Sequence, residues 1–274
     1  MRNLIVVLVL ALAFAQGQQA NADEPSLTIS FGGGDKVYRA ADLLALGDAT
    51  EIHIKNDIAY RGPMSFRVVP LLDLLGNLDD TEFDTLQARA TDGFVSQIPL
   101  ALFRKAKEGG AVPWIAIDDA KKPWPDMPGK SFSAGPFYLI WQHAGRSNVG
   151  QEQWPYALAE LSGVVSPVKR WPQMAVADSV AVDAPERRGL NVFIKNCLSC
   201  HRIKGAGKGD MGPDLDEPMN PTEYMTSVGL RRLIRDPTSV RTWPNQVMQG
   251  FDESVIPDNE LDDLIAYLRY IAHI

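Results

Sequence analysis

Two cysteines and a histidine stand together in the last third of the chain, as Cys197-Leu-Ser-Cys200-His201. The 274 residues contain no other cysteine, so this segment holds every thiol of the protein. One helical turn at this spacing carries both thiols toward a single porphyrin, and the next residue directs its imidazole at the iron. C-x-x-C-H is the pattern at which a c-type haem is attached through two thioether bonds. We therefore predict that Cys197 and Cys200 attach one haem covalently and that His201 is an axial ligand of its iron.

A redox-active dithiol is the alternative interpretation of the same two cysteines. Such a site would follow a strand inside a βαβ unit. The residues before the cysteines instead have helical periodicity, with Leu190, Phe193 and Ile194 on one face. Asp183-Ala-Pro-Glu186 fits a capped start for that helix. The helical context favours haem attachment.

A second axial ligand is expected among the methionines that follow the motif. A thioether favours ferrous iron and raises the reduction potential, as suits an electron carrier. We predict Met248, which lies 47 residues beyond His201 in an irregular stretch from which it can approach the opposite haem face. Met211 and Met219 follow the haem-binding turn closely, and Met225 is expected to pack in a short helix. A core methionine is the alternative for Met248.

Pro213 lies in a Gly-Pro turn shortly after His201. Its carbonyl is expected to accept a hydrogen bond from the imidazole, which would orient the ring and strengthen it as a ligand. A final amphipathic helix is expected from Asp258, and we expect it to pack against the helix that leads to the cysteines. Its apolar stripe consists of Leu261, Leu264, Ile265, Leu268 and Ile271.

In the order and spacing of these features, residues 185–274 resemble a class I cytochrome c. The resemblance rests on Cys197–His201, Gly212-Pro213-Asp-Leu215, Trp243, Met248 with Phe251, and Tyr267-Leu268. It implies an all-α domain around one haem c, with His201 and Met248 as the iron ligands. It also implies that Pro213 and Trp243 belong to the haem pocket, and that the domain exchanges single electrons with redox partner proteins.

Residues 1–22 have the pattern of a secretory signal peptide. Arg2 precedes the apolar run Leu4–Ala15, and Ala20-Asn-Ala22 is a small-x-small cleavage site. As a helix the twelve-residue run spans about 18 Å, which is less than the roughly 30 Å bilayer core. A buried helix and an uncleaved anchor are the alternatives. We expect cleavage after Ala22, export to a bacterial periplasm and a mature form that does not span the membrane.

The net charge of −7 disfavours binding to nucleic acid, which requires a basic surface to neutralise phosphates. Hydrophobic residues make up 45% of the chain, enough to bury a real core, so broad disorder is excluded. We expect two domains, residues 23–171 and 185–274, joined by a linker of small and polar residues at 172–184.

The first of these domains is rich in strand-like runs. Thr91-Asp92-Gly93-Phe94 predicts a tight hairpin turn. Expected strands are Leu27–Phe31, Glu51–Asn56, Leu86–Thr91, Phe94–Ile98, Trp114–Asp118 and Phe137–Gln142, with a short helix at Val69–Leu75. The histidines His53 and His143 lack the spacing of a metal site.

This region resembles the molybdopterin-binding domain of the sulfite oxidase superfamily in a small, truncated form. The resemblance rests on Tyr60-Arg-Gly-Pro63, Phe66–Leu75, Ala90–Pro99 and Ser133–Trp141. Catalytic members of that superfamily bind molybdenum through one cysteine, and residues 23–171 contain none. We therefore expect no molybdopterin cofactor and assign no catalytic residue.

The expected fold class is an α+β domain like the sulfite oxidase molybdopterin domain, followed by an all-α cytochrome c domain. The expected function is that of a periplasmic monohaem electron carrier whose non-catalytic N-terminal domain docks a partner or positions the haem. A molybdenum-dependent dehydrogenase of the sulfite dehydrogenase type is one alternative. A haem sensor or a peroxidase-like protein with an open iron site is another.

Overall fold

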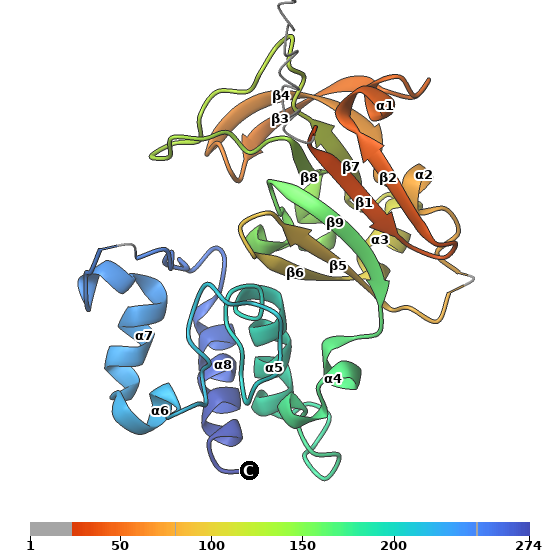
Figure 1. Ribbon diagram of the computed structural model, residues 1–274. Coiled ribbons are helices and arrows are strands. Elements are labelled where there is room, and N and C mark those ends of the chain that lie inside the picture. Colours follow the sequence, from red (N-terminus) through yellow and green to blue (C-terminus); the bar gives the residue numbers. More distant parts are fainter. Residues whose placement is uncertain (1–23, 80, 245) are drawn as a thin grey trace, which may run out of the picture.

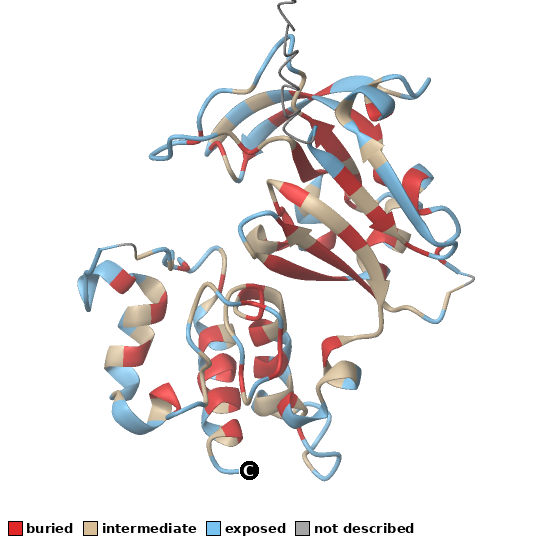
Figure 2. Cartoon of the chain, in the orientation of Figure 1, coloured by how far each residue is buried: buried red, intermediate tan, exposed pale blue. Residues whose placement is uncertain are grey.

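The computed structural model describes residues 24–79, 81–244 and 246–274 (Figure 1). The expected signal peptide lies outside these residues. In the described ranges, no helix combines the length and apolar character needed to cross a bilayer. Buried residues form two cores, one within residues 27–161 and one within residues 174–271 (Figure 2).

Two β-sheets build the N-terminal region. The first has the strand order β2-β1-β9-β5-β6, and the second has the order β3-β4-β7-β8. All neighbouring strands are antiparallel except β1 and β9. The strands are β1 (Ser26–Ser30), β2 (Asp35–Arg39), β3 (Thr50–Asp57), β4 (Gly62–Pro70), β5 (Thr85–Ala90), β6 (Val95–Pro99), β7 (Val112–Ile117), β8 (Phe137–Gln142) and β9 (Leu158–Val164). Three short helices follow β2, β4 and β6: α1 (Ala40–Leu44), α2 (Leu71–Leu75) and α3 (Leu100–Ala106).

The predicted hairpin turn is confirmed, since β5 and β6 pair in antiparallel register around Asp92 and Gly93. The Asp92 carboxylate accepts a hydrogen bond from the Phe94 N–H at 3.0 Å. Gly93 has a φ of 93°, a conformation that glycine adopts without strain. This turn places β6 at the edge of its sheet.

Helices dominate the C-terminal region. They are α5 (Pro185–Asn196), α6 (Pro221–Tyr224), α7 (Ser227–Arg235) and α8 (Asp258–Ile271), preceded by α4 (Pro167–Arg170). Short 3₁₀ helices are η1 (Ala144–Ser147), η2 (Gln151–Gln153), η3 (Pro172–Met174) and η4 (Pro237–Ser239). The capping role expected of Asp183 is wrong, because the N-cap of α5 is Ala184 and no side chain caps it.

The expected packing of α5 against α8 is confirmed, and it depends on a glycine. A Cβ added at Gly189 would lie 1.9 Å from the carbonyl oxygen of Asp263, so only glycine lets the two helices approach this closely. The rings of Phe193 and Tyr267 meet beside the crossing, with centroids 5.6 Å apart. Arg188 adds two hydrogen bonds of 2.7 Å to the Asp263 carboxylate.

The segment 172–184, which we expected to be a linker, lies along this second core. Met174 and Val176 are buried in it. The Met174 carbonyl accepts a hydrogen bond from the Tyr267 hydroxyl at 2.9 Å, and the Ala177 N–H donates to the Tyr270 hydroxyl at 3.0 Å. These contacts hold the segment against the C-terminal helices.

The expected fold class is wrong as stated and needs correction. The N-terminal region is built on a five-stranded and a four-stranded sheet, and its helices are short connections. The C-terminal domain is helical but not all-α. Isolated β-bridges pair Arg202 with Asp214 and Ile203 with Ala206.

The reason for these bridges is the composition of the loop after the haem-attachment motif. Its helix-breaking residues are Gly205, Gly207, Gly209, Gly212, Pro213 and Pro218. Backbone groups that a helix would satisfy find other partners instead. The Asp214 carboxylate accepts from the N–H groups of Lys204 and Gly205 at 3.0 and 2.8 Å.

Candidate haem site

The two cysteines and the histidine lie on one tight turn at the end of α5. Cys197 is the C-cap residue, and its N–H bonds the Phe193 carbonyl at 2.8 Å. The N–H groups of Cys200 and His201 both bond the Cys197 carbonyl, at 3.1 and 2.9 Å. The turn therefore continues α5 for one more turn and brings both thiols and the imidazole together.

Both thiols are free and partly buried. Burial raises the pKa of Cys200 to about 12 and that of Cys197 beyond the usual range, and the charge of Glu152 adds to both shifts. A redox-active dithiol requires a thiolate, and hence a lowered pKa. The direction of both shifts therefore opposes the dithiol interpretation.

The imidazole of His201 is oriented for metal binding. Its Nδ1 lies 2.8 Å from the carbonyl oxygen of Pro213. A carbonyl can only accept, so Nδ1 carries the proton and Nε2 keeps a free lone pair. Burial lowers the pKa of His201, which favours the neutral ring that a metal requires.

Gly212 makes room for the same ring. A Cβ at this position would lie 2.4 Å from Cε1 and 2.6 Å from Nδ1 of His201. The glycine thus lets the loop pass close enough for the Pro213 carbonyl to reach the imidazole. Sequence reasoning identified Pro213 and used Gly212 only as part of the resemblance.

Trp243 and Met248 lie in the irregular segment between η4 and α8. Met248 is partly buried, and Trp243 is 47% exposed with the Arg241 guanidinium 4.8 Å from its ring centroid. Within the described ranges, no hydrogen bond or ring contact joins either residue to the cysteines or His201. Met211 does contact the motif, with its sulfur 4.0 Å from that of Cys200.

The chemistry of these side chains fits a haem c. Two protonated thiols on one turn and a neutral imidazole with Nε2 free are the groups that covalent attachment and axial ligation require. Along the Met248 segment, Val240, Trp243 and Val247 are 41%, 47% and 51% exposed. Apolar side chains are thus exposed on the segment that contains the predicted ligand Met248.

The haem-attachment turn also packs against the N-terminal region. The Val95 N–H of edge strand β6 donates to the Ser199 carbonyl, between the two cysteines, at 3.3 Å. Val95, Ser96, Gln97 and Ile98 are buried although β6 is an edge strand. The cytochrome side therefore covers the open edge of the first sheet.

Two glycines sit in this interface. A Cβ at Gly93 would lie 2.8 Å from an Asp210 carboxylate oxygen, and one at Gly150 would lie 2.5 Å from Cε of Lys195. Sequence reasoning missed these pairs and Glu152, because the partners are far apart in the chain and belong to different regions. No local sequence pattern predicts such contacts.

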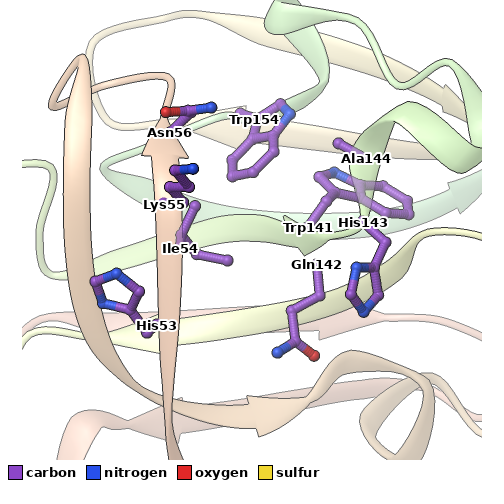
Figure 3. Close-up of a pocket in the computed structure, with 9 residues that line it drawn as sticks. All are labelled: His53, Ile54, Lys55, Asn56, Trp141, Gln142, His143, Ala144 and Trp154. Carbon is purple, nitrogen blue, oxygen red and sulfur yellow. The ribbon is translucent and has the colours of Figure 1, made fainter.

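The N-terminal region has a separate hollow of about 350 Å³ (Figure 3). His53 and Lys55 extend from β3, and His143 follows the end of β8, beside Trp141 and Trp154. In the described part of the chain, no group of three or more histidine, cysteine or acidic residues could hold a metal ion.

Comparison with known families agrees with this geometry. Residues 187–272 match the family model described as cytochrome c. The C-terminal region is therefore a cytochrome c domain, which implies covalently bound haem c, electron transfer and redox partners. No curated protein matches the chain. The family match leaves the N-terminal region aside, so its resemblance to the sulfite oxidase superfamily stays a prediction.

Proposed function

We propose that the protein is a periplasmic monohaem c-type cytochrome that transfers single electrons, with a non-catalytic N-terminal domain that positions the haem. The observation that carries the proposal is the turn at Cys197–His201, with Nδ1 of His201 fixed on the Pro213 carbonyl at 2.8 Å. The presence of two cysteines in the whole chain supports a single attachment site. The signal-peptide pattern of residues 1–22 supports the periplasmic location.

In this proposal each site residue has a distinct role. Cys197 and Cys200 would hold the haem through thioether bonds, and His201 and Met248 would supply the ligands of its iron. Pro213 keeps the imidazole in one orientation and raises its basicity as a ligand. Trp243 would belong to the haem pocket. When bound, the haem iron supplies the chemistry by cycling between its ferric and ferrous forms.

The N-terminal domain is assigned a positioning role for two reasons. Residues 23–171 contain no cysteine that could bind molybdenum. In addition, the backbone bond from Val95 to Ser199 and the burial of β6 fix this domain directly on the haem-attachment turn. An interface of this kind would hold the haem in one orientation toward a redox partner.

Metal analysis and an absorption spectrum of the intact protein test the proposal. The protein is produced in a host that attaches haem c. We expect one iron per chain, no molybdenum and a low-spin spectrum in both redox states. Molybdenum at a near-unit ratio would favour the dehydrogenase, and a high-spin ferric spectrum would favour the sensor or peroxidase-like protein.

Replacing Met248 tests the second iron ligand. Met248→His keeps six-coordinate iron but exchanges a thioether for a donor that favours ferric iron, so the reduction potential should fall. A tenfold change in relative affinity corresponds to about 59 mV for one electron, and we expect a fall on the order of 100–200 mV by redox titration.

Met211→His and Met225→His are the matched controls. Met211 lies beside Cys200, and Met225 packs against the second core. Both variants should leave the potential nearly unchanged. A large fall in one of them, together with an unchanged potential in Met248→His, would move the ligand to that methionine.

A further inference from the structure

Glu152 lies where the two regions of the molecule meet. It is the central residue of η2, which packs against β6 on one side and α5 on the other. The Ser96 hydroxyl donates to the Glu152 carbonyl at 2.7 Å and fixes this segment on β6. The side chain of Lys195 on α5 lies over the neighbouring Gly150. The backbone of Glu152 is therefore held at the interface.

Glu152 lies near the haem-attachment turn, because η2 packs against α5, the helix whose C-cap is Cys197. Its charge contributes to the raised pKa of both Cys197 and Cys200. These two sulfur atoms are the points at which a haem edge would be bonded. A charge that acts on the sulfurs therefore also acts on the haem that they carry.

This carboxyl group has little to stabilise its charge. Its hydrogen-bond partner among the described residues is the Gln151 amide at 3.4 Å, and no ion pair reaches it in those ranges. Removal from water raises the pKa of Glu152 to about 7. Glu152 as a whole residue is partly exposed, so protons can reach it.

Other titratable groups surround Glu152 and must be considered with it. Asp92 on the β5–β6 turn and Tyr156 after η2 belong to the same electrostatic cluster, since burial raises the pKa of Tyr156 and the charges of Asp92 and Glu152 add to the shift. Lys195 comes from α5, and Asp210 faces Gly93 from the loop after the motif. The two thiols cease to titrate once they form thioethers, whereas the propionates of a bound haem would titrate.

We propose that Glu152 takes up a proton when the cytochrome domain is reduced and releases it on oxidation. This inference rests on the proposed function. One electron arrives from a redox partner protein and one proton from water, which converts the Glu152 carboxylate to the acid. Both leave on oxidation. Ferric haem carries one more positive charge than ferrous haem, so the carboxylate is favoured in the oxidised state.

The reduction potential of the intact haem protein, measured from pH 5.5 to 8.5, tests the proposal. The wild-type potential should fall as pH rises through this range. A tenfold difference in proton affinity between the two redox states corresponds to about 59 mV. Glu152→Gln should abolish the fall and hold the potential at the value that the wild type has at low pH. Glu152→Asp, which keeps an ionisable group, should retain a pH-dependent step.

Glu51→Gln is the matched control, because it removes the same charge from β3 in the other sheet. It should keep the wild-type pH dependence. A second readout is the reduced-minus-oxidised infrared difference spectrum, in which a protonated carboxyl band should be present in the wild type and absent in Glu152→Gln.

Two results would overturn the role of Glu152. One is a pH dependence that persists in Glu152→Gln, which would assign the proton to the haem propionates or another group. The other is a wild-type potential that does not change with pH. A wild-type protein without a reversible haem couple would instead overturn the proposed function.

Discussion

The two regions of the molecule bury their apolar side chains in different ways. In the N-terminal region Phe66, Tyr138 and Trp141 are almost completely buried in the first core, and the rings of Phe66 and Tyr138 pack with centroids 5.8 Å apart. In the C-terminal region α5 and α8 form a compact pair, whereas Trp243 and Val247 remain about half exposed. The family match implies that the C-terminal region also packs against a covalently bound haem, whereas we assign no cofactor to the N-terminal region.

This difference implies different sources of stability. Several paired strands with a hydrophobic face can be stable on their own. A small domain that buries its apolar surface against a cofactor couples folding to binding of that cofactor. The N-terminal region should therefore tolerate loss of haem, and the cytochrome domain should not.

Removal of either thiol that we propose as a haem attachment point should have the largest effect on this contrast. In full-length Cys197→Ala or Cys200→Ala we expect haem retention to be weakened or lost and the level of folded cytochrome domain to fall. The helical circular dichroism signal of the C-terminal region should be almost completely lost, while the signal of the N-terminal sheets is preserved. This result would mean that only the cytochrome domain needs haem to fold.

Amide hydrogen exchange locates the loss within the molecule. The Val95 N–H bonds Ser199 in the other region, so it should exchange rapidly in the cysteine variants. The paired amides of β5 and β9 should remain protected. A well-folded cytochrome domain without haem would contradict the expectation that this domain depends on haem for its folding.

Sequence reasoning reached the features that are local. It located the turn at Cys197–His201, the helical stripes of α5 and α8, and the strands β1, β3, β5, β6, β7 and β8, with ends that differ by one or two residues. It missed β2 because Asp35–Arg39 is mostly polar and exposed, and β4 because its first residues are Gly62 and Pro63. It missed β9, whose alanine, serine and glycine weaken the apolar pattern.

The contacts of the site also divide into those that the local sequence predicts and those that it does not. The bond between His201 and Pro213 follows from residues twelve positions apart. The contact of Val95 with Ser199 requires that an edge strand meet a turn more than one hundred residues later. Strand edges have no side-chain signature, because their backbone groups are the same in every sequence.

The helix crossing at Gly189 offers the next largest effect. Gly189→Ala places a Cβ against the carbonyl oxygen of Asp263, so α5 and α8 must move apart. Overpacking of this kind costs about 3 kcal/mol, which outweighs the gain of about 1 kcal/mol in helix propensity. Thermal or denaturant unfolding should show the cytochrome domain destabilised, with the N-terminal transition unchanged.

Gly229→Ala is the control for this variant, since it makes the same substitution inside α7. There the nearest heavy atoms to a Cβ are Oγ1 of Thr226 at 3.2 Å and Cε of Met225 at 3.7 Å. This change should be neutral or slightly stabilising. Equal destabilisation by both substitutions would mean that the close crossing of α5 and α8 contributes nothing specific.

The smallest effect is expected at the contact between the two regions. Gly93 and Gly32 both have positive φ, 93° and 65°, so alanine at either position costs about 1–2 kcal/mol of backbone strain in the N-terminal region. They differ in surroundings: a Cβ at Gly93 would meet the Asp210 carboxylate at 2.8 Å, whereas one at Gly32 has no atom within 4 Å. Because the Asp210 side chain can rotate away, only a slight loosening of the interface is expected.

The Val95 amide should exchange a few-fold faster in Gly93→Ala relative to the β5 amides, and this ratio should not change in Gly32→Ala. The same ratio in both variants would show that the β5–β6 turn does not stabilise the interface with the cytochrome domain. The interface would then depend on β6 and η2 alone.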